Sequence, residues 1–230
     1  MSIGNRVYLK RNLPDSALVK RFSTLPAANV ADKMNRLCAL HSDIKLQSSP
    51  SQEMCGVALT VKARPGDNLM LHQALNMAQP GDVIVLSNEG DRSQSIMGLI
   101  MYEYLADFKK VAGIVIDGPI RDIDEISKRD VPIYATGSTP GGPFKEGPGE
   151  VNVPIAIGGI SINPGDIILG DADGVIVIPK QDAPNVIDAA EDNAKKDAAK
   201  VQKSSAGATD RSWVNKLLEK KNVEFIDDAY

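Results

Sequence analysis

The most constraining feature of the sequence is a short β-branched run that ends in a glycine–proline turn. Residues 113–117 read Gly-Ile-Val-Ile-Asp, and a short, β-branched apolar run bounded by glycines favours a buried strand over a helix. Gly118 and Pro119 end this strand, because proline has no N–H for the sheet and glycine packs no side chain. Arg121 and Asp122 therefore leave the sheet on a bend.

This Arg-Asp pair is the first candidate for chemistry. In α/β folds ligands bind at the carboxyl ends of the strands, which is where Arg121 and Asp122 are expected. Arginine offers a fork of donors to an anion, and aspartate offers a hard oxygen to a divalent metal. A solvated charge pair on an ordinary turn is the competing interpretation, and the dipeptide alone favours it.

Length and charge narrow the class of protein. A chain of 230 residues with 43% hydrophobic and 24% charged residues can build one α/β domain with a sizeable core, or two small ones. A net charge of -4 argues against a nucleic-acid partner. No apolar signal segment opens the sequence and no run is long enough to span a membrane, so we expect a soluble, cytoplasmic protein.

Cysteines and histidines are too few for a structural zinc site. Cys38 and Cys55 are expected to be reduced thiols rather than a disulfide, and His41 and His72 do not form a metal-binding H-x-x-x-H pair. A metal site would have to be built from carboxylates and water. Such ligands suit Mg²⁺ or Mn²⁺.

The order of elements predicts a mixed α/β fold. Strands are expected over residues 56–63, 83–87, 113–117, 131–135, 152–157, 160–162, 167–170 and 174–178. Helices are expected over residues 15–22, 27–37, 68–79, 95–108, 123–129 and 182–206, with a last short helix around Trp213. We expect an α/β domain over residues 1–205 and a helical extension over 206–230. The alanine-lined face of the helix after Asp182 is a candidate contact with a partner subunit.

Two residues are given particular roles in these helices. Asn68 is expected to cap the helix that follows it. Gly98 is expected in the first turn of the helix over 95–108, where glycine costs stability. Close approach of the backbone to a ligand would explain this glycine, because free N–H groups at a helix start bind carboxylates and phosphates. A glycine that packs against a neighbouring strand is the alternative.

Four stretches carry a family resemblance, and they span roughly residues 27–205. They are Gly56 to Val61 with Gly66-Asp67-Asn68, residues 113–122, Gly158-Gly159 with Pro164-Gly165-Asp166, and Gly170 to Val175. In this order they resemble the RraA-like family. That family includes the 4-hydroxy-4-methyl-2-oxoglutarate/4-carboxy-4-hydroxy-2-oxoadipate aldolases.

The resemblance implies a fold, an assembly and an activity. It implies a single domain of the swivelling β/β/α type, a homotrimer or hexamer, and a divalent metal such as Mg²⁺ or Mn²⁺. The implied activity is that of a lyase that cleaves a 4-hydroxy-2-oxo acid to pyruvate, with oxaloacetate decarboxylase activity beside it. The implied catalytic residues are Arg121, which binds substrate, and Asp122, which holds the metal. The implied carboxylate-binding amides belong to Gly98, Leu99, Ile100 and Met101. Water on the metal is the expected base.

One departure from the family pattern opens a second interpretation. Aldolase members carry an acid directly after the glycine, whereas here Leu99 follows Gly98. In those members twenty residues separate the acid from the Arg-Asp pair, and the same count back from Arg121 gives Ile100. A one-residue insertion near Phe108 would account for the difference, so the position of the family's acid stays open between Leu99 and Ile100. Carboxylates that could substitute are Glu89, Asp91 and Glu103. The missing acid favours an alternative function, a non-catalytic RraA-type regulator that binds ribonuclease E, because an acidic chain can mask a basic partner.

Overall fold

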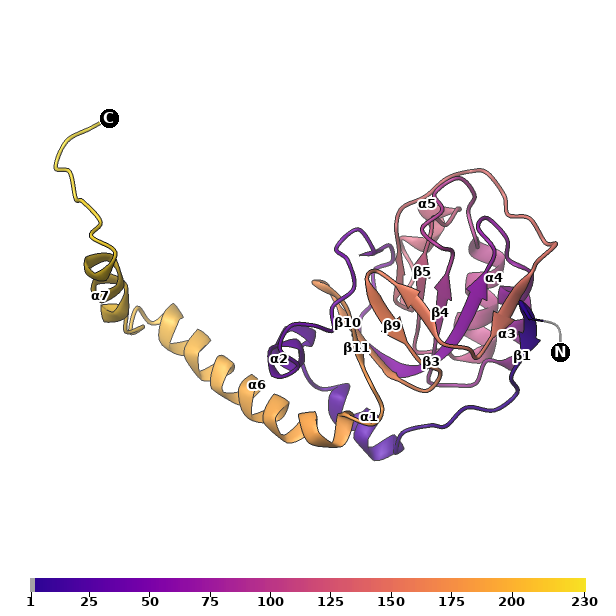
Figure 1. Cartoon of the computed structure of the whole chain (residues 1–230), viewed down its shortest axis with the longest axis horizontal. Helices are drawn as coiled ribbons and strands as arrows, with labels where there is room; N and C mark the ends of the chain where they lie inside the picture. The colour runs from indigo at the N-terminus through magenta and orange to yellow at the C-terminus, as the bar shows by residue number, and fades with distance from the viewer. Residues whose placement is uncertain (1–2) are drawn as a thin grey trace.

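The computed structural model describes residues 3–230 and centres on a nine-stranded mixed sheet (Figure 1). Its strand order is β1-β7-β3-β4-β5-β6-β2, with β10 paired to β3 and β11 paired to β10. The strands are β1 (Asn5–Val7), β2 (Lys45–Leu46), β3 (Met54–Ala63), β4 (Asp82–Ser87), β5 (Gly113–Asp117), β6 (Ile133–Ala135), β7 (Gly149–Val151), β10 (Ile167–Asp171) and β11 (Gly174–Ile178). A separate hairpin is formed by β8 (Ile155–Ile157) and β9 (Ile160–Ile162).

Helices flank the sheet. They are α1 (Ser16–Phe22), α2 (Ala27–Lys33), α3 (Leu69–Met77), α4 (Leu99–Glu103), α5 (Ile123–Ile126), α6 (Ala183–Ser205) and α7 (Ser212–Lys220). A π-helical segment, η1 (Tyr104–Lys109), continues α4 without a break. The mixed α/β class expected from the sequence is confirmed.

Four neighbouring strands, β3, β4, β5 and β6, run parallel. Their carboxyl ends therefore lie at one edge of the sheet, and Asp117, at the end of β5, pairs in register with Ser87 at the end of β4. In β3, the consecutive residues Ala58, Leu59 and Thr60 are all fully buried. A central parallel strand is covered on both faces, so its sequence need not alternate.

The core lies on both sides of these parallel strands. One cluster packs α3, α4 and η1 against the sheet through residues such as Leu71, Met97 and Leu105. The opposite cluster includes Val115 of β5 and Ile155 of the β8–β9 hairpin. Burial on both faces leaves the edge of the sheet at the carboxyl ends as the place where loops carry polar side chains.

Several predicted element boundaries were wrong. The second helix ends at Lys33 rather than near Leu37, because Asn35 and Arg36 have positive φ angles of 55° and 60°, and Leu37 is 78% exposed. The helix predicted to begin at Ser95 begins at Leu99 and becomes π-helical at Tyr104. The helix predicted over 123–129 is the short α5, and the strand predicted over 131–135 is reduced to β6.

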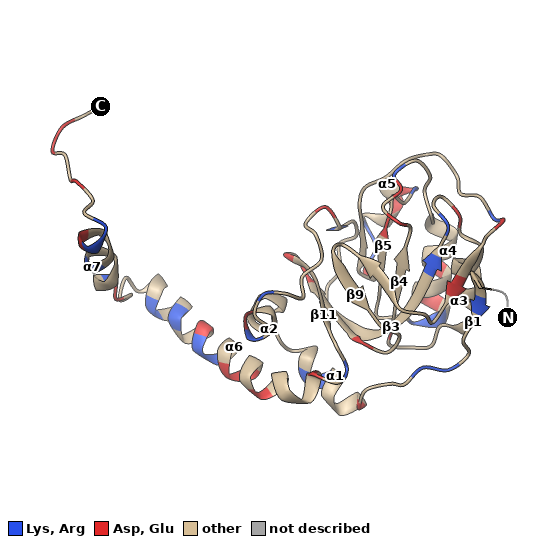
Figure 2. Ribbon diagram, viewed as in Figure 1, with Lys and Arg blue, Asp and Glu red and all other residues tan. Residues whose placement is uncertain are grey.

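The long helix α6 begins on the body and leaves it as an arm (Figure 1). In its first turns Ile187 and Ala190 pack with residues of α1 and α2 in a third apolar cluster, so this part of the helix is covered within the chain. Val201, further along, is 67% exposed. Figure 2 shows acidic residues near the body and mostly basic ones toward the far end of the helix, before α7.

Cys38 and Cys55 are both free thiols, as predicted. Among residues 3–230, no helix combines the length and the apolar character that a membrane crossing requires.

Candidate active site

The predicted Arg-Asp pair lies on the turn that follows β5. The N–H group of Arg121 donates to the carbonyl oxygen of Met97 at 3.0 Å, and the N–H group of Ile96 donates to that of Pro119 at 2.9 Å. These bonds tie the turn to the segment that precedes α4. Asp122 has a φ angle of 62°, in the left-handed region that aspartate tolerates better than most residues. Backbone held in this region is common at ligand sites.

Gly98 is required because the chain at this point lies close to the Arg121–Asp122 turn, rather than to a neighbouring strand. It precedes α4 rather than lying in its first turn, with φ -138° and ψ -169°, so its backbone is ordinary. A Cβ atom at this position would collide with Oδ2 of Asp122 and would lie 2.9 Å from Cγ of Arg121. The glycine therefore lets the start of α4 contact the Arg-Asp turn. The N–H group of Leu99 donates to Oδ2 of Asp122 at 2.9 Å.

The next two amides at the start of α4 are free. The carbonyl oxygen of Ile96 accepts from the side chain of Asn68, and that of Met97 accepts from Arg121. Among the bonds made by residues 3–230, none is donated by the N–H groups of Ile100 or Met101. Unpaired N–H groups at a helix start attract anions. The structure thus brings the predicted amides of residues 98–101 beside Arg121 and Asp122.

These groups face a shared hollow of about 220 Å³. Its walls include Asn68, His72, Met97, Gly98, Ile100, Met101, Arg121, Asp122, Pro143 and Lys145. Arg121 and Lys145 bring positive charge and Asp122 brings one negative charge. Burial, and then the charge of Lys145, lower the pKa of His72 from 6.5, so His72 is neutral at pH 7. The hollow suits an anion that also carries oxygen atoms for a metal.

The sequence missed three of these residues. His72 lies on α3 and Lys145 lies in the loop over 136–148, far from Arg121 along the chain. Asn68 was predicted to cap α3, but its side chain makes no capping bond and instead donates from Nδ2 to the carbonyl oxygen of Ile96 at 2.9 Å. His72 follows Asn68 by four residues, but this spacing gives no signal of a site until the fold is known.

The three carboxylates considered as substitutes for the missing acid do not line this hollow. Glu103 pairs with Arg129, with Oε1 at 2.7 Å from Nη2. Asp91 accepts from the hydroxyl and N–H groups of Ser93. Glu89 lines a different hollow, together with Lys62 and Arg64 among others. Asp122 is thus the carboxylate that this chain brings to the hollow.

The donor set at Asp122 fits a hydrated divalent ion. Oδ2 accepts from Leu99, and no described residue donates to Oδ1, on a side chain that is about half exposed. Mg²⁺ is commonly held by one or two carboxylates, with waters and substrate oxygens as the other ligands. Within residues 3–230 there is no cluster of three His, Cys, Asp or Glu side chains that could enclose a metal. Asp122 would therefore hold Mg²⁺ or Mn²⁺ together with water and substrate.

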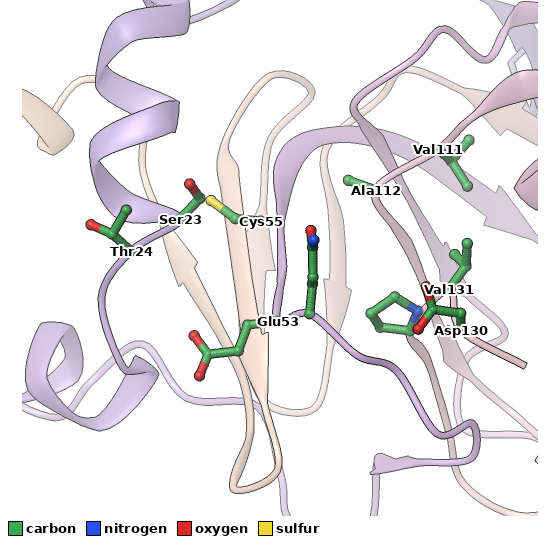
Figure 3. Close-up of a pocket in the computed structure, with 10 residues that line it drawn as sticks. Ser23, Thr24, Glu53, Cys55, Val111, Ala112, Asp130 and Val131 are labelled. Carbon is green, nitrogen blue, oxygen red and sulfur yellow. The ribbon is translucent and has the colours of Figure 1, made fainter.

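A larger hollow of about 600 Å³ lies near the amino ends of β3, β5 and β6 (Figure 3). Glu53 and Asp130 bring negative charge to its walls, and neither lysine nor arginine contributes to them. Burial raises the pKa of the Cys55 thiol to about 12, with a further contribution from Glu53, so this thiol stays protonated. The larger hollow is unsuited to an anionic substrate. The smaller one at Arg121 is the candidate active site.

Comparisons with known proteins agree with the sequence resemblance. The family model described as RraA-like, Aldolase/RraA, matches residues 27–177. A Halalkalibacterium halodurans protein, provisionally named 4-hydroxy-4-methyl-2-oxoglutarate aldolase, is 37% identical over 201 residues, which are 87% of this chain and 95% of that protein.

Solved structures show the same fold. An uncharacterised protein from Pseudomonas syringae pv. tomato has a TM-score of 0.74 at 27% identity, over 86% of this chain and 97% of that one. Streptomyces coelicolor RraAS2, described as an unusual member of the RNase ES inhibitor RraA protein family, has a TM-score of 0.73 at 29% identity, over 82% of this chain and 98% of that one. The chain therefore belongs to the RraA-like family.

Proposed function

We propose that this chain is a divalent-metal-dependent lyase that cleaves a 4-hydroxy-2-oxo acid to pyruvate, with oxaloacetate decarboxylation as a related activity. The observation that carries the proposal is the convergence of Arg121, Asp122 and the free amides of Ile100 and Met101 at one hollow. The aldolase name of the Halalkalibacterium halodurans relative supports the same reaction class.

Different residues of the hollow would bind different groups of the substrate. The free amides at the start of α4 would accept the carboxylate of the 2-oxo acid. Arg121 would donate charge-assisted hydrogen bonds to the 2-oxo oxygen, which gains negative charge as the bond between C3 and C4 breaks. Asp122 would hold Mg²⁺ or Mn²⁺, which supplies Lewis-acid stabilisation of that charge when bound.

Cleavage also moves one proton. The proton leaves the C4 hydroxyl group, the C3–C4 electron pair moves toward the oxo group, and C3 is protonated afterwards to give pyruvate. His72 is neutral because burial lowers its pKa, so its ring can accept a proton at neutral pH. His72 thus joins water as a candidate base.

Pyruvate release is the direct test. Native protein is given 4-hydroxy-4-methyl-2-oxoglutarate or oxaloacetate with Mg²⁺, and again with a chelator. Arg121→Leu is expected to lower kcat/KM by about a hundredfold or more, because one donor to a developing oxyanion is lost. Asp122→Asn is expected to remove the Mg²⁺ dependence, and Asp107→Asn, an exposed acid on η1, is the matched control. Equal activity in all four proteins would contradict the proposal.

A second function has a specific observation in its favour. An apolar residue, Leu99 or Ile100, stands where aldolase members carry an acid, and the Streptomyces structure is described as a member of an RNase inhibitor family. A non-catalytic regulator that binds ribonuclease E is therefore the alternative. Native protein that releases no pyruvate from either substrate, but lowers ribonuclease E cleavage of an RNA at a stoichiometric ratio, would establish this alternative.

We also propose that the chain works as a homotrimer or hexamer, as the family resemblance implies. The arm formed by α6 and α7 supports this. Trp213 and Leu217 of α7 are 61% and 42% exposed in the single chain. Apolar side chains gathered on one short helix are usually covered by another surface.

A further inference from the structure

Asn68 leaves an unsatisfied acceptor in the wall of the active-site hollow. The residue is only 2% exposed and lines the hollow together with Arg121 and Asp122. Its Nδ2 donates to the carbonyl oxygen of Ile96 at 2.9 Å, while its buried Oδ1 has no hydrogen-bond partner among the described residues. Buried amide oxygens are rarely left without a donor, so this one needs an explanation.

The orientation of the amide is fixed by its partner. If Oδ1 and Nδ2 exchanged places, an oxygen would face the carbonyl oxygen of Ile96, and two acceptors would repel each other. The backbone of Asn68 is fixed as well. Its N–H group donates to the carbonyl oxygen of Phe144 at 3.0 Å, and its carbonyl oxygen accepts from the N–H group of His72 at 3.1 Å. Both the backbone and the side-chain amide of Asn68 are therefore held in place.

Apart from the Asp122 carboxylate, which would hold the metal, and the neutral ring of His72, the charged side chains and free amides of the hollow have the opposite character. Arg121, Lys145 and the free amides of Ile100 and Met101 are donors. These donors match the carboxylate and keto oxygens of a 2-oxo acid, which are acceptors only. Because Asn68 lines the same hollow, a ligand group that donates a hydrogen bond could satisfy its Oδ1. In an ionised 4-hydroxy-2-oxo acid that group is the hydroxyl.

We propose that Oδ1 of Asn68 accepts a hydrogen bond from the substrate hydroxyl and thereby selects hydroxylated 2-oxo acids over those without a hydroxyl. This inference rests on the proposed function and assigns it a specificity-determining residue. Asn68 is a positioning residue, because it orients the hydroxyl and takes no proton. A site built to bond a hydroxyl discriminates against an analogue that lacks it, since the buried partner is then left unpaired.

A matched pair of ligands tests the proposal. 4-Hydroxy-2-oxoglutarate and 2-oxoglutarate carry the same two carboxylates and the same keto group, and differ in the hydroxyl. Their Kd values are measured by calorimetry in the presence of a chelator, which suppresses turnover. Native protein is expected to prefer the hydroxylated ligand, and Asn68→Leu to lower that preference by about fivefold to tenfold, with little change in the Kd of 2-oxoglutarate.

Two further variants separate recognition from folding. Asn76→Leu makes the same substitution on α3 at a residue outside the hollow, and it should keep the preference. Asn68→Asp keeps an acceptor but loses the bond to Ile96, and it should keep the preference if the variant is folded by circular dichroism. Should Asn68→Leu fail to fold, Asn68→Ala, which also removes the acceptor, takes its place.

The binding measurements can fail independently of the pyruvate assay, so the role of Asn68 and the lyase activity are tested separately. Equal binding of both ligands by native protein would overturn the proposal and assign Oδ1 of Asn68 to a buried water. Equal weakening of both ligands by Asn68→Leu would overturn it too, as would loss of preference in folded Asn68→Asp. A protein that prefers the hydroxylated ligand through Asn68 yet releases no pyruvate would contradict the proposed lyase and leave the role of Asn68 intact. In an active enzyme, the Asn68→Leu effect should appear in KM more than in kcat.

Discussion

At the Arg121–Asp122 turn, two opposite charges lie side by side, with Nε of Arg121 3.9 Å from Oδ2 of Asp122. Both side chains are about half exposed, so their mutual attraction is screened and contributes little stability. The two groups therefore remain available to a ligand, Arg121 to an anion and Asp122 to a cation. The Leu99 amide, rather than the arginine, fixes the carboxylate.

A prediction at the residue scale concerns the ionisation of His72. Burial is the first cause of its lowered pKa and the charge of Lys145 is the second. We expect an NMR pH titration to place the midpoint of His72 below 6.5, and Lys145→Gln to move it part of the way back. His41 is the other histidine, so two ring signals need to be assigned. If Lys145→Gln left the midpoint of His72 unchanged, the charge of Lys145 would not be a cause of the lowered pKa.

The sequence could identify the residues of this site that share one turn, but not those brought to it by the fold. Arg121 and Asp122 directly follow a strand whose end is marked by Gly-Pro, so the position of both relative to the sheet is encoded locally. His72 and Lys145 come from a helix and a loop elsewhere in the chain, and only tertiary packing places them beside Arg121. Asn68 was assigned a local role as a helix cap, which tertiary hydrogen bonding overrides.

At the scale of elements, the parallel strands β4 and β5 were predictable and the start of α4 was not. The strands β4 and β5 are apolar runs bounded by glycine, and their observed bounds differ from the predicted ones by at most one residue. The start of α4 at Leu99 depends on the contact between Gly98 and the Arg121–Asp122 turn, which no local pattern encodes. The π-helical continuation η1 spans Phe108, where the insertion was expected. A π-helix accommodates an extra residue within a helix.

This π-helix leads to a prediction about the missing acid. If η1 absorbs the inserted residue, the family acid corresponds to Leu99, whose N–H group already bonds Asp122. Leu99→Glu is expected to raise Mg²⁺-dependent decarboxylation of oxaloacetate by about tenfold, the typical effect of a group that supports a metal site. Ile100→Glu, at a neighbouring side chain that is 85% exposed, is the control and should give no gain.

The thermal stability of Leu99→Glu is measured alongside its activity. Leu99 packs partly against the core, so a glutamate there removes apolar contact. A gain in Ile100→Glu instead would show that η1 does not shift the register. No gain in either variant, combined with an inactive native protein, would favour the regulator.

A second prediction at this scale concerns the segment before α1. Arg11 binds both carboxylate oxygens of Asp82, at 2.9 and 2.8 Å, and both side chains are largely buried. Arg11→Ala leaves a buried carboxylate without its partner, so we expect the free energy of unfolding to fall by about 3–5 kcal/mol. Urea unfolding measures this loss. Arg36→Ala removes an exposed pair with Asp32 and should cost less than about 1 kcal/mol.

Equal losses in Arg11→Ala and Arg36→Ala would show that the Arg11 pair is solvated in solution. A loss in Arg11→Ala that vanishes when Asp82→Asn is added would confirm that the unpaired carboxylate causes the destabilisation.

At the scale of the whole molecule, the arm of α6 and α7 is the part that the body does not cover. The family match ends at residue 177, and α6 follows at Ala183. A helix rises about 1.5 Å per residue, so the 23 residues of α6 extend over about 35 Å. Figure 1 shows α7 at the far end of this arm, well away from α4 and α5 of its own chain.

The last prediction joins the arm to the proposed assembly. The chain has one tryptophan, Trp213 on α7, so its fluorescence reports on this helix alone. In a trimer or hexamer whose neighbouring copies cover α7, acrylamide should quench Trp213 less than it quenches a peptide of residues 206–230. Light scattering at micromolar concentration should then give a multiple of three chains.

Leu217→Ser, on the same helix, is expected to raise quenching by weakening the apolar contact, whereas Lys216→Ser, at a charged and exposed neighbour, should not. A monomer by light scattering, with Trp213 as accessible as in the peptide, would contradict both the assembly and the role of the arm. A trimer in which Trp213 stays fully accessible would keep the assembly and place its interface on the body of the molecule.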